Sequence, residues 1–231
     1  MGDQSIPFVR FVDQYPPYAS RADIEWLFRS LSAEHVVDIF LALLAEKKVL
    51  LISKYKALLT HACVAFMSFL FPFSWKHVLI PILPRSMIDV LDAPVPFLIG
   101  ADPSIFNSNP LSEDVIETGY EETYASVEIP QEVYRVDLDM GLIVEEKKMK
   151  HKAVAQLKSR LKKATDHLER PDPYLHLVDQ AFNVVSYQED EYGNETEGKA
   201  FRFNEYEVRD AFLEFMQAIM ANYTLHLVIL I

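Results

Sequence analysis

A continuous apolar strand followed directly by a long apolar helix is the feature that most restricts the fold of this chain. Residues 49–52 read Val-Leu-Leu-Ile, and residues 57–71 are almost entirely apolar. A strand without polar alternation is typical of a sheet that is covered on both faces. Apolar residues at helical spacing after Ser32 predict a helix before this strand. We therefore predict an α/β fold in which helices flank a central sheet on both faces, followed by a helical C-terminal portion.

Two more apolar segments extend the predicted sheet. Residues 75–80 and 97–100 have strand composition, and prolines bound both segments. We expect residues 49–52, 78–80 and 97–99 to form neighbouring buried strands, with the helix at 57–71 crossing between strands. The sequence also predicts a short helix at 85–91.

The rest of the chain is less regular. Two strands are expected at 133–136 and 142–145, on either side of a turn at 137–141, and another extended segment at 6–12. Helices are expected at 147–168 and 205–223, separated by an acidic loop at 187–199. The apolar residues that the last helix should bury are Val208, Phe212, Phe215, Met216 and Ile219.

Charge and composition exclude several classes of protein. The net charge of -12 disfavours nucleic-acid binding, because affinity for phosphate backbones depends on Lys and Arg. The single cysteine, Cys63, cannot form an internal disulfide, and the N-terminal residues do not have the pattern of a secretory leader, so a cytoplasmic location is expected. The apolar stretch at 57–73 is shorter than the roughly 20 residues that a membrane span needs.

No motif for covalent chemistry, cofactor binding or metal binding is present. The six glycines do not have the spacing of a phosphate-binding loop or of a nucleophile elbow. Asp137 and Asp139 with Gly141 resemble half of a calcium loop, but the terminal Glu is missing, which favours a simple turn. His61 and Cys63 point in different directions on a helix, and we expect both to be core residues.

The helix expected at 147–168 is strongly basic. From Lys147 to Lys163 it contains eight Lys and Arg residues and no acid, so it forms a positive patch on an acidic protein. Two interpretations remain open: a solvated helix face, or a contact with anionic lipid or with an acidic partner surface. The residues selected for an anionic-surface contact are Lys152, Lys158, Lys162 and Lys163.

An ordered series of motifs resembles the central segment of DENN domains. The series is LAEKKVLLIS at 44–53, FPFSW at 71–75, IPILP at 80–84 and DAPVPFLIG at 92–100. VDLD at 136–139 and VRDAFLEFM at 208–216 resemble the stretches that follow in the same family. The resemblance covers residues 20–231 and is strongest over residues 20–101.

The resemblance implies a division of the chain and a function. Residues 1–15 would be a remnant of an upstream longin-like lobe, 16–146 the central DENN segment, 147–200 a linking helix with an acidic loop, and 201–231 the truncated start of the downstream segment. DENN modules are similar in releasing GDP from Rab-type small GTPases in membrane trafficking, by differential binding rather than bond chemistry. With one lobe nearly absent, this chain alone is expected to bind its GTPase weakly and to stimulate exchange little.

The exchange surface must be exposed and polar or aromatic, which selects Arg85, Ser86 and Asp89 after the IPILP motif. The alternative is a non-exchanging GTPase-binding or scaffold module in a larger complex. If such a module activated hydrolysis, it would need an exposed arginine, for which Arg85, Arg135 and Arg160 are candidates. Peripheral contact with an anionic membrane is compatible with either function.

Overall fold

A computed structural model of the chain describes residues 19–106, 129–143, 152–168 and 203–221. Within these ranges, a five-stranded sheet has the order β2-β3-β1-β4-β5. Its strands are β1 (Lys48–Ile52), β2 (Val78–Ile80), β3 (Phe97–Ala101), β4 (Tyr134–Asp137) and β5 (Leu142–Ile143). The pairs β2–β3, β3–β1 and β1–β4 are parallel, and only β5 is antiparallel to its neighbour β4. The predicted α/β class and the neighbouring positions of the first three strands are confirmed.

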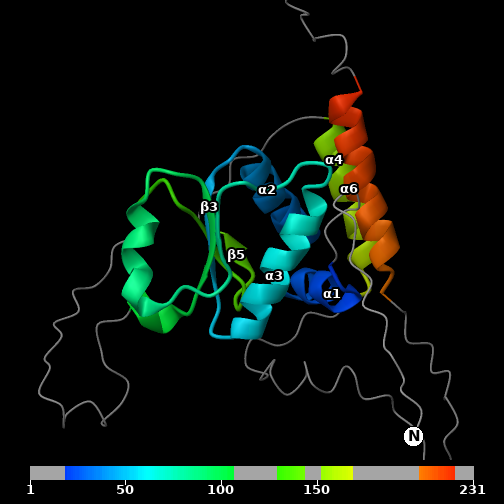
Figure 1. Cartoon of the computed structure of the whole chain (residues 1–231). Helices are drawn as coiled ribbons and strands as arrows, with labels where there is room; N and C mark the ends of the chain where they lie inside the picture. The colour runs from blue at the N-terminus through cyan, green and yellow to red at the C-terminus, as the bar shows by residue number, and fades with distance from the viewer. Residues whose placement is uncertain (1–18, 107–128, 144–151, 169–202, 222–231) are drawn as a thin grey trace, which may run out of the picture.

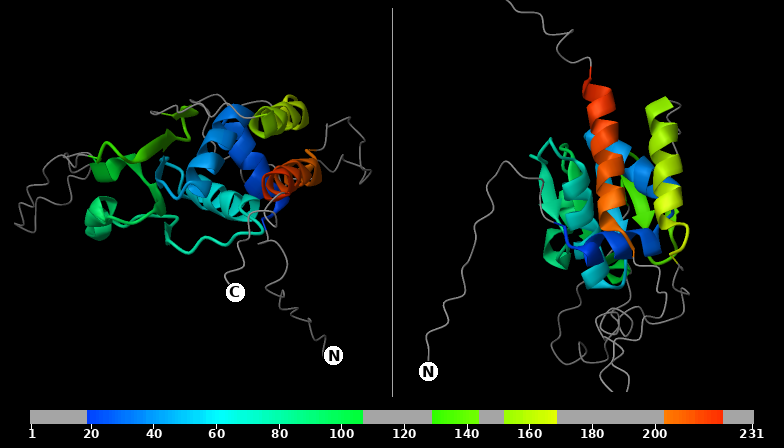
Figure 2. Two further views of the ribbon diagram at one scale, coloured as in Figure 1. Left: turned by 90° about the horizontal axis from the view of Figure 1, so that it is seen from above. Right: turned by 90° about the vertical axis from the view of Figure 1, so that its right-hand side faces the viewer.

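Helices cover the sheet in layers, which Figure 1 shows with the sheet seen on edge. One face carries α1 (Arg21–Ser30), α2 (Ala33–Leu44) and α3 (Lys56–Phe69). A second helical layer, formed by α4 (Lys152–Thr165) and α6 (Glu205–Met220), lies outside the first, and the two views of Figure 2 confirm this placement. The opposite face is covered by the 3-10 helix η1 (Arg85–Asp92), and a short 3-10 helix, η2 (Pro103–Phe106), follows β3.

Short polar side chains fix where the first helices begin. Ser20 Oγ accepts a hydrogen bond from Asp23 N (3.2 Å), and the Asp23 carboxylate accepts one from Ser20 N (2.5 Å), which completes a reciprocal cap. Ser32 Oγ accepts from His35 N (3.1 Å) at the start of α2. Ser20 and Ser32 are therefore the N-caps of α1 and α2, and they set where the chain enters the helical layer.

The buried side chains form two clusters, one on each face of the sheet. The helical-side core, between the sheet and the helices, includes Phe40, Phe66 and Phe212. The η1-side core is much smaller and contains Leu50, Leu83, Leu91, Phe97, Ile99, Ala101 and Val133. Alternate residues of β1 and β3 point into the two clusters, which explains why these strands are apolar throughout.

The outer layer is joined to the helical-side core by aromatic packing and by one ion pair. The Phe212 ring stacks on Phe69 with centroids 4.0 Å apart and meets Phe40 edge-on at 4.8 Å. Lys158 Nζ of α4 lies 2.6 Å from the Oδ1 atom of the buried Asp38 on α2. The segments that contain α4 and α6 therefore share one core with the sheet.

Three expectations about burial are wrong, and each has a physical reason. Strand β2 is not buried: it lies at the edge of the sheet, and Leu79 is 42% exposed. Ile219 is 44% exposed, because the last turn of α6 extends past the residues that α6 buries. His61 is half-exposed rather than in the core, and its Nδ1 lies 2.6 Å from Asp23 Oδ1. The expected strand at 6–12 and acidic loop at 187–199 lie outside the described residues.

Gly100 illustrates why the DAPVPFLIG motif ends in glycine. A Cβ atom at this position would overlap the carbonyl oxygen of Pro81 and would lie 3.1 Å from Leu59 Cβ. The missing side chain lets the chain after β2 lie close to β3, where Leu83 N donates to Gly100 O (2.7 Å).

We expect Gly100→Ala to lower the free energy of unfolding by about 1–3 kcal/mol, because the added methyl group must displace backbone rather than a flexible side chain. Urea denaturation followed by circular dichroism measures this change. The control is Ala45→Gly, which changes one methyl group at an exposed site. The neighbouring Ala101 is buried and is therefore unsuitable as a control. A Gly100→Ala protein as stable as the wild type would contradict the steric argument.

Candidate functional site

The candidate partner-binding residues lie on the outer side of η1. This 3-10 helix begins after Pro84, whose carbonyl accepts from Met87 N (3.0 Å), and it ends with Ala93 N donating to Val90 O (3.1 Å). Leu91 is buried in the η1-side core, and Ile88 and Val90 pack against it. The residues that remain exposed include Arg85, Ser86 and Asp89. We refer to these three residues and Met87 as the η1 surface.

The structure brings the three predicted residues together on one short element. Each is exposed, which a partner contact requires, while the inward residues hold η1 against the sheet. Arg85 and Asp89 give this surface charges of both signs within one helix of eight residues. The arrangement is suited to polar recognition by a protein, and it contains no group placed for bond chemistry.

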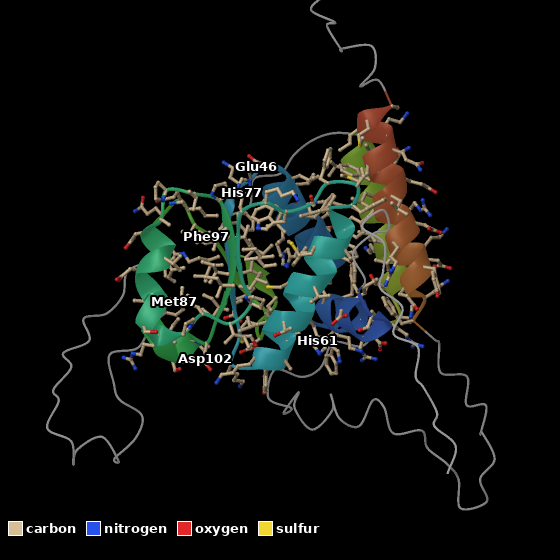
Figure 3. All side chains as sticks on the ribbon, in the orientation of Figure 1. Glu46, His61, His77, Met87, Phe97 and Asp102 are labelled. Carbon is tan, nitrogen blue, oxygen red and sulfur yellow. The ribbon has the colours of Figure 1, made fainter. Side chains whose placement is uncertain are left out.

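Sequence reasoning did not select Met87, which is 48% exposed between Ser86 and Ile88. Figure 3 labels it on η1, on the side of the sheet opposite to α3. Spacing alone does not separate Met87 from the inward residues, because Met87 has the same i, i+3 relation to Val90 as Ile88 has to Leu91.

The predicted basic face on α4 is only partly available. Lys152, Lys162 and Lys163 are exposed, whereas Lys158 forms the ion pair with Asp38 described above. Arg160 is paired with Glu214 of α6. The structure thus assigns Lys158 to holding α4 on α2, and the remaining basic face consists of Lys152, Lys162 and Lys163. The residues 147, 148 and 150 lie outside the described part of the chain.

The candidate arginine fingers differ in accessibility. Arg135 is a half-buried residue of β4, between β1 and β5 in the sheet, and Arg160 is held by Glu214. Arg85 is exposed at the first position of η1. Arg85 and Arg160 are thus both exposed, and of the two only Arg85 lies on the η1 surface.

The turn with Asp137 and Asp139 is structural, as the sequence predicts. Asp137 Oδ1 accepts from Met140 N (2.9 Å), and Gly141 has a φ of 66°. The two Asp139 oxygens accept from Ser53 Oγ (2.6 Å) and Lys54 N (3.0 Å), so this carboxylate connects the end of β1 to the β4–β5 turn. Across the described ranges, no group of three or more His, Cys, Asp or Glu side chains could hold a metal ion.

Cys63 and His77 lie in different surroundings, one buried and one paired at the surface. Burial raises the pKa of the Cys63 thiol to about 12, so the reactive thiolate is scarce at neutral pH. His77 Nε2 lies 3.0 Å from Glu46 Oε1, and Figure 3 labels both residues at one end of the sheet. These two residues line a hollow of about 500 Å³ together with Phe73 and Trp75, away from the η1 surface.

Comparison with known proteins identifies the family. The sequence pattern of the DENN (AEX-3) domain matches residues 1–118, which is half of the chain. The chain belongs to the DENN domain family. DENN domain-containing protein 2A of Mus musculus is 46% identical over 78 residues, which is 34% of this chain and 8% of that protein.

Two further relatives match longer parts of the chain. DENN domain-containing protein 2C of Mus musculus is 37% identical over 99 residues, covering 43% of this chain and 10% of that protein. Elicitor of plant defense protein 1 of Gibberella zeae is 30% identical over 172 residues, covering 70% of this chain and 13% of that protein. The chain therefore spans only about a tenth of the length of these curated relatives.

The extent of the DENN match separates the two candidate surfaces. Residues 1–118 contain β1, α3, β2, η1 and β3, so the η1 surface lies inside the matched segment. Helix α4, with its basic face, lies beyond it. None of the helices in the described ranges has the length and apolar character needed to cross a membrane.

Proposed function

We propose that this DENN chain is a guanine-nucleotide exchange module that promotes GDP release from a Rab-type small GTPase in membrane trafficking. DENN domains are generally associated with this activity, and the observation that carries the proposal here is the position of the η1 surface within the matched segment. Arg85, Ser86 and Asp89 would contact the GTPase. The module itself would make and break no covalent bonds.

The physical basis of exchange is a difference in affinity. A protein that binds the nucleotide-free GTPase more tightly than the GDP-bound form lowers the barrier to GDP release. An ordered surface is needed for such discrimination, and η1 is held to the sheet by the packing of Ile88, Val90 and Leu91. The surface can therefore select a partner conformation without first ordering itself.

The test is the release of a fluorescent GDP analogue from a panel of purified Rab GTPases, with the 231-residue chain and with the longest natural form of the protein. Acceleration for one or a few Rabs supports the proposal. Tight binding to a nucleotide-free Rab without acceleration would favour the non-exchanging module. If no Rab binds either protein, the proposal is wrong.

The basic face of α4 would bring this module to a membrane surface, as a second part of the proposal. Lys152, Lys162 and Lys163 are exposed, although Asp166 follows in the next turn and lowers the local positive charge. Attraction to an anionic leaflet is worth about 1 kcal/mol for each basic residue near the surface. This contribution can orient a cytoplasmic protein peripherally, but it is too weak to anchor it alone.

We expect Lys162→Gln/Lys163→Gln to weaken binding to phosphatidylserine vesicles about tenfold or more, since two attractive charges are lost. Flotation at about 0.1 M and 1 M salt measures the effect, because salt screens surface charges. The control Lys47→Gln/Lys76→Gln removes the same charge from exposed sites elsewhere. Binding that is insensitive to both salt and the α4 substitutions would exclude this role for α4.

A further inference from the structure

Met87 departs from the pattern of η1. The other apolar residues of this helix, Ile88, Val90 and Leu91, are buried or pack against the η1-side core. Met87 instead is 48% exposed, and its φ of -115° and ψ of 19° interrupt the helical geometry of η1. Among the apolar residues of η1, Met87 is therefore the exposed one, on the helix that Figure 3 shows opposite to α3.

The exposure of Met87 is part of a local concentration. A single exposed apolar residue needs no explanation in a soluble protein. However, two further large apolar residues close to η1 in the sequence, Ile82 and Val95, are also exposed. Ile82 precedes η1 by three residues and Val95 follows it by three, so apolar side chains flank both ends of η1.

Charged and polar groups surround Met87. Arg85 and Ser86 precede it and Asp89 follows it, and all three are exposed. An apolar centre with a polar rim is the usual composition of a protein–protein interface, in which Met and Arg are enriched. The flexible thioether side chain of Met can adapt to an apolar hollow of irregular shape.

We propose that Met87 is the apolar anchor of the GTPase contact on the η1 surface, inserted into an apolar hollow of the partner. The proposal rests on the proposed function and deepens it. Charge complementarity specifies the rim of that hollow: an acidic group on the partner faces Arg85, and a basic or hydrogen-bond donor group faces Asp89. Because Leu91 packs η1 against the sheet as one ordered unit, Met87 is already exposed before the partner binds.

A membrane is the less suitable occupant. If Met87 were inserted into a bilayer, the carboxylates of Asp89 and Asp92 would come against lipid headgroups, which repel acids on an anionic leaflet. The net charge of -12 adds to this repulsion. A protein surface can instead provide a positive group for each carboxylate.

The experiment compares Met87→Glu and Met87→Ala with Met140→Glu. Met140 is 58% exposed in the β4–β5 turn, so its substitution adds the same charge at a matched exposed methionine. Affinity is measured by biolayer interferometry against a nucleotide-free Rab that binds the wild-type chain. Phosphatidylserine vesicles form a parallel arm, and thermal denaturation checks folding.

We expect Met87→Glu to weaken Rab binding at least tenfold and Met87→Ala to weaken it about fivefold, because an anchor at the centre of an interface contributes much of the affinity. The affinity of the Met140→Glu protein should stay within about twofold of the wild type. Normal Rab affinity in a folded Met87→Glu variant would overturn the proposal and leave the proposed function standing. Equal losses from Met87→Glu and Met140→Glu would also overturn it, since any added acid would then suffice. Loss of vesicle binding alone would assign Met87 to a membrane. If no Rab binds the wild-type protein, the proposed function and this inference both fail.

Discussion

In the longest natural form of the protein, Arg85→Glu is expected to reduce both nucleotide-free Rab binding and GDP release about tenfold or more, while the protein stays folded. Reversing a charge at an interface replaces an attraction by a like-charge repulsion, which costs several kcal/mol when the groups are desolvated. Arg85 is exposed at the first position of η1, and the inward residues of this helix are not changed by the substitution. GDP release from the responsive Rab and thermal denaturation are measured on the same preparations.

Lys76→Glu is the matched control for this charge reversal. Lys76 is exposed in the loop before β2, whereas Arg85 follows this strand, and both substitutions change the net charge equally. The control should retain exchange activity within about twofold, because long-range effects of net charge are screened at physiological salt. Normal activity of a folded Arg85→Glu protein would remove Arg85 from the proposed contact without affecting the family assignment.

Phe212→Ala is expected to lower the free energy of unfolding by about 3–5 kcal/mol, the range for removing a buried aromatic side chain. Phe212 is 2% exposed and contacts both Phe69 and Phe40 through its ring. The substitution removes buried apolar area, leaves a cavity, and also removes aromatic pair contacts worth about 0.5–1.5 kcal/mol each. Urea denaturation monitored by both fluorescence and circular dichroism measures the change.

This experiment also tests whether α6 belongs to the same cooperative unit as the sheet. Helix α6 lies beyond the matched residues 1–118, yet its aromatic residues complete the helical-side core. Ile219→Ala on the same helix is the control, since Ile219 is 44% exposed and should cost less than about 1 kcal/mol. A small effect of Phe212→Ala, or two separate transitions in the wild type, would show that the outer helical layer unfolds independently.

Local patterns in the sequence predict the centre of the fold well. The apolar runs of β1 and β3 require cover on both faces, and the structure provides it. The edge position of β2 could not be inferred, because an apolar sequence does not show whether a strand has one neighbouring strand or two. The exposure of His61 depends on its pairing with Asp23, which is 38 residues away in the sequence.

The candidate site was predictable to a similar degree. Polar residues after a proline-bounded strand indicate an exposed turn or short helix, and Arg85, Ser86 and Asp89 lie on such an element. Lys158 was grouped with the basic face because its partner, Asp38, is 120 residues away. Met87 was missed because an apolar residue in a short helix is ordinarily assigned to the inward face, and the interruption at its φ and ψ angles is visible only in three dimensions.

The unequal size of the two cores has a consequence for how the molecule responds to a partner. Among the described residues, 35 buried side chains make up the helical-side core and seven make up the η1-side core. The free energy of a local opening increases with the apolar area that the opening exposes. We therefore expect that η1 can shift on the sheet as one ordered unit at a much lower free-energy cost than α2 or α3. The proposed GTPase contact therefore lies on the face of the sheet with the smaller core. Small movements of η1 on binding a partner would leave the helical-side core unchanged.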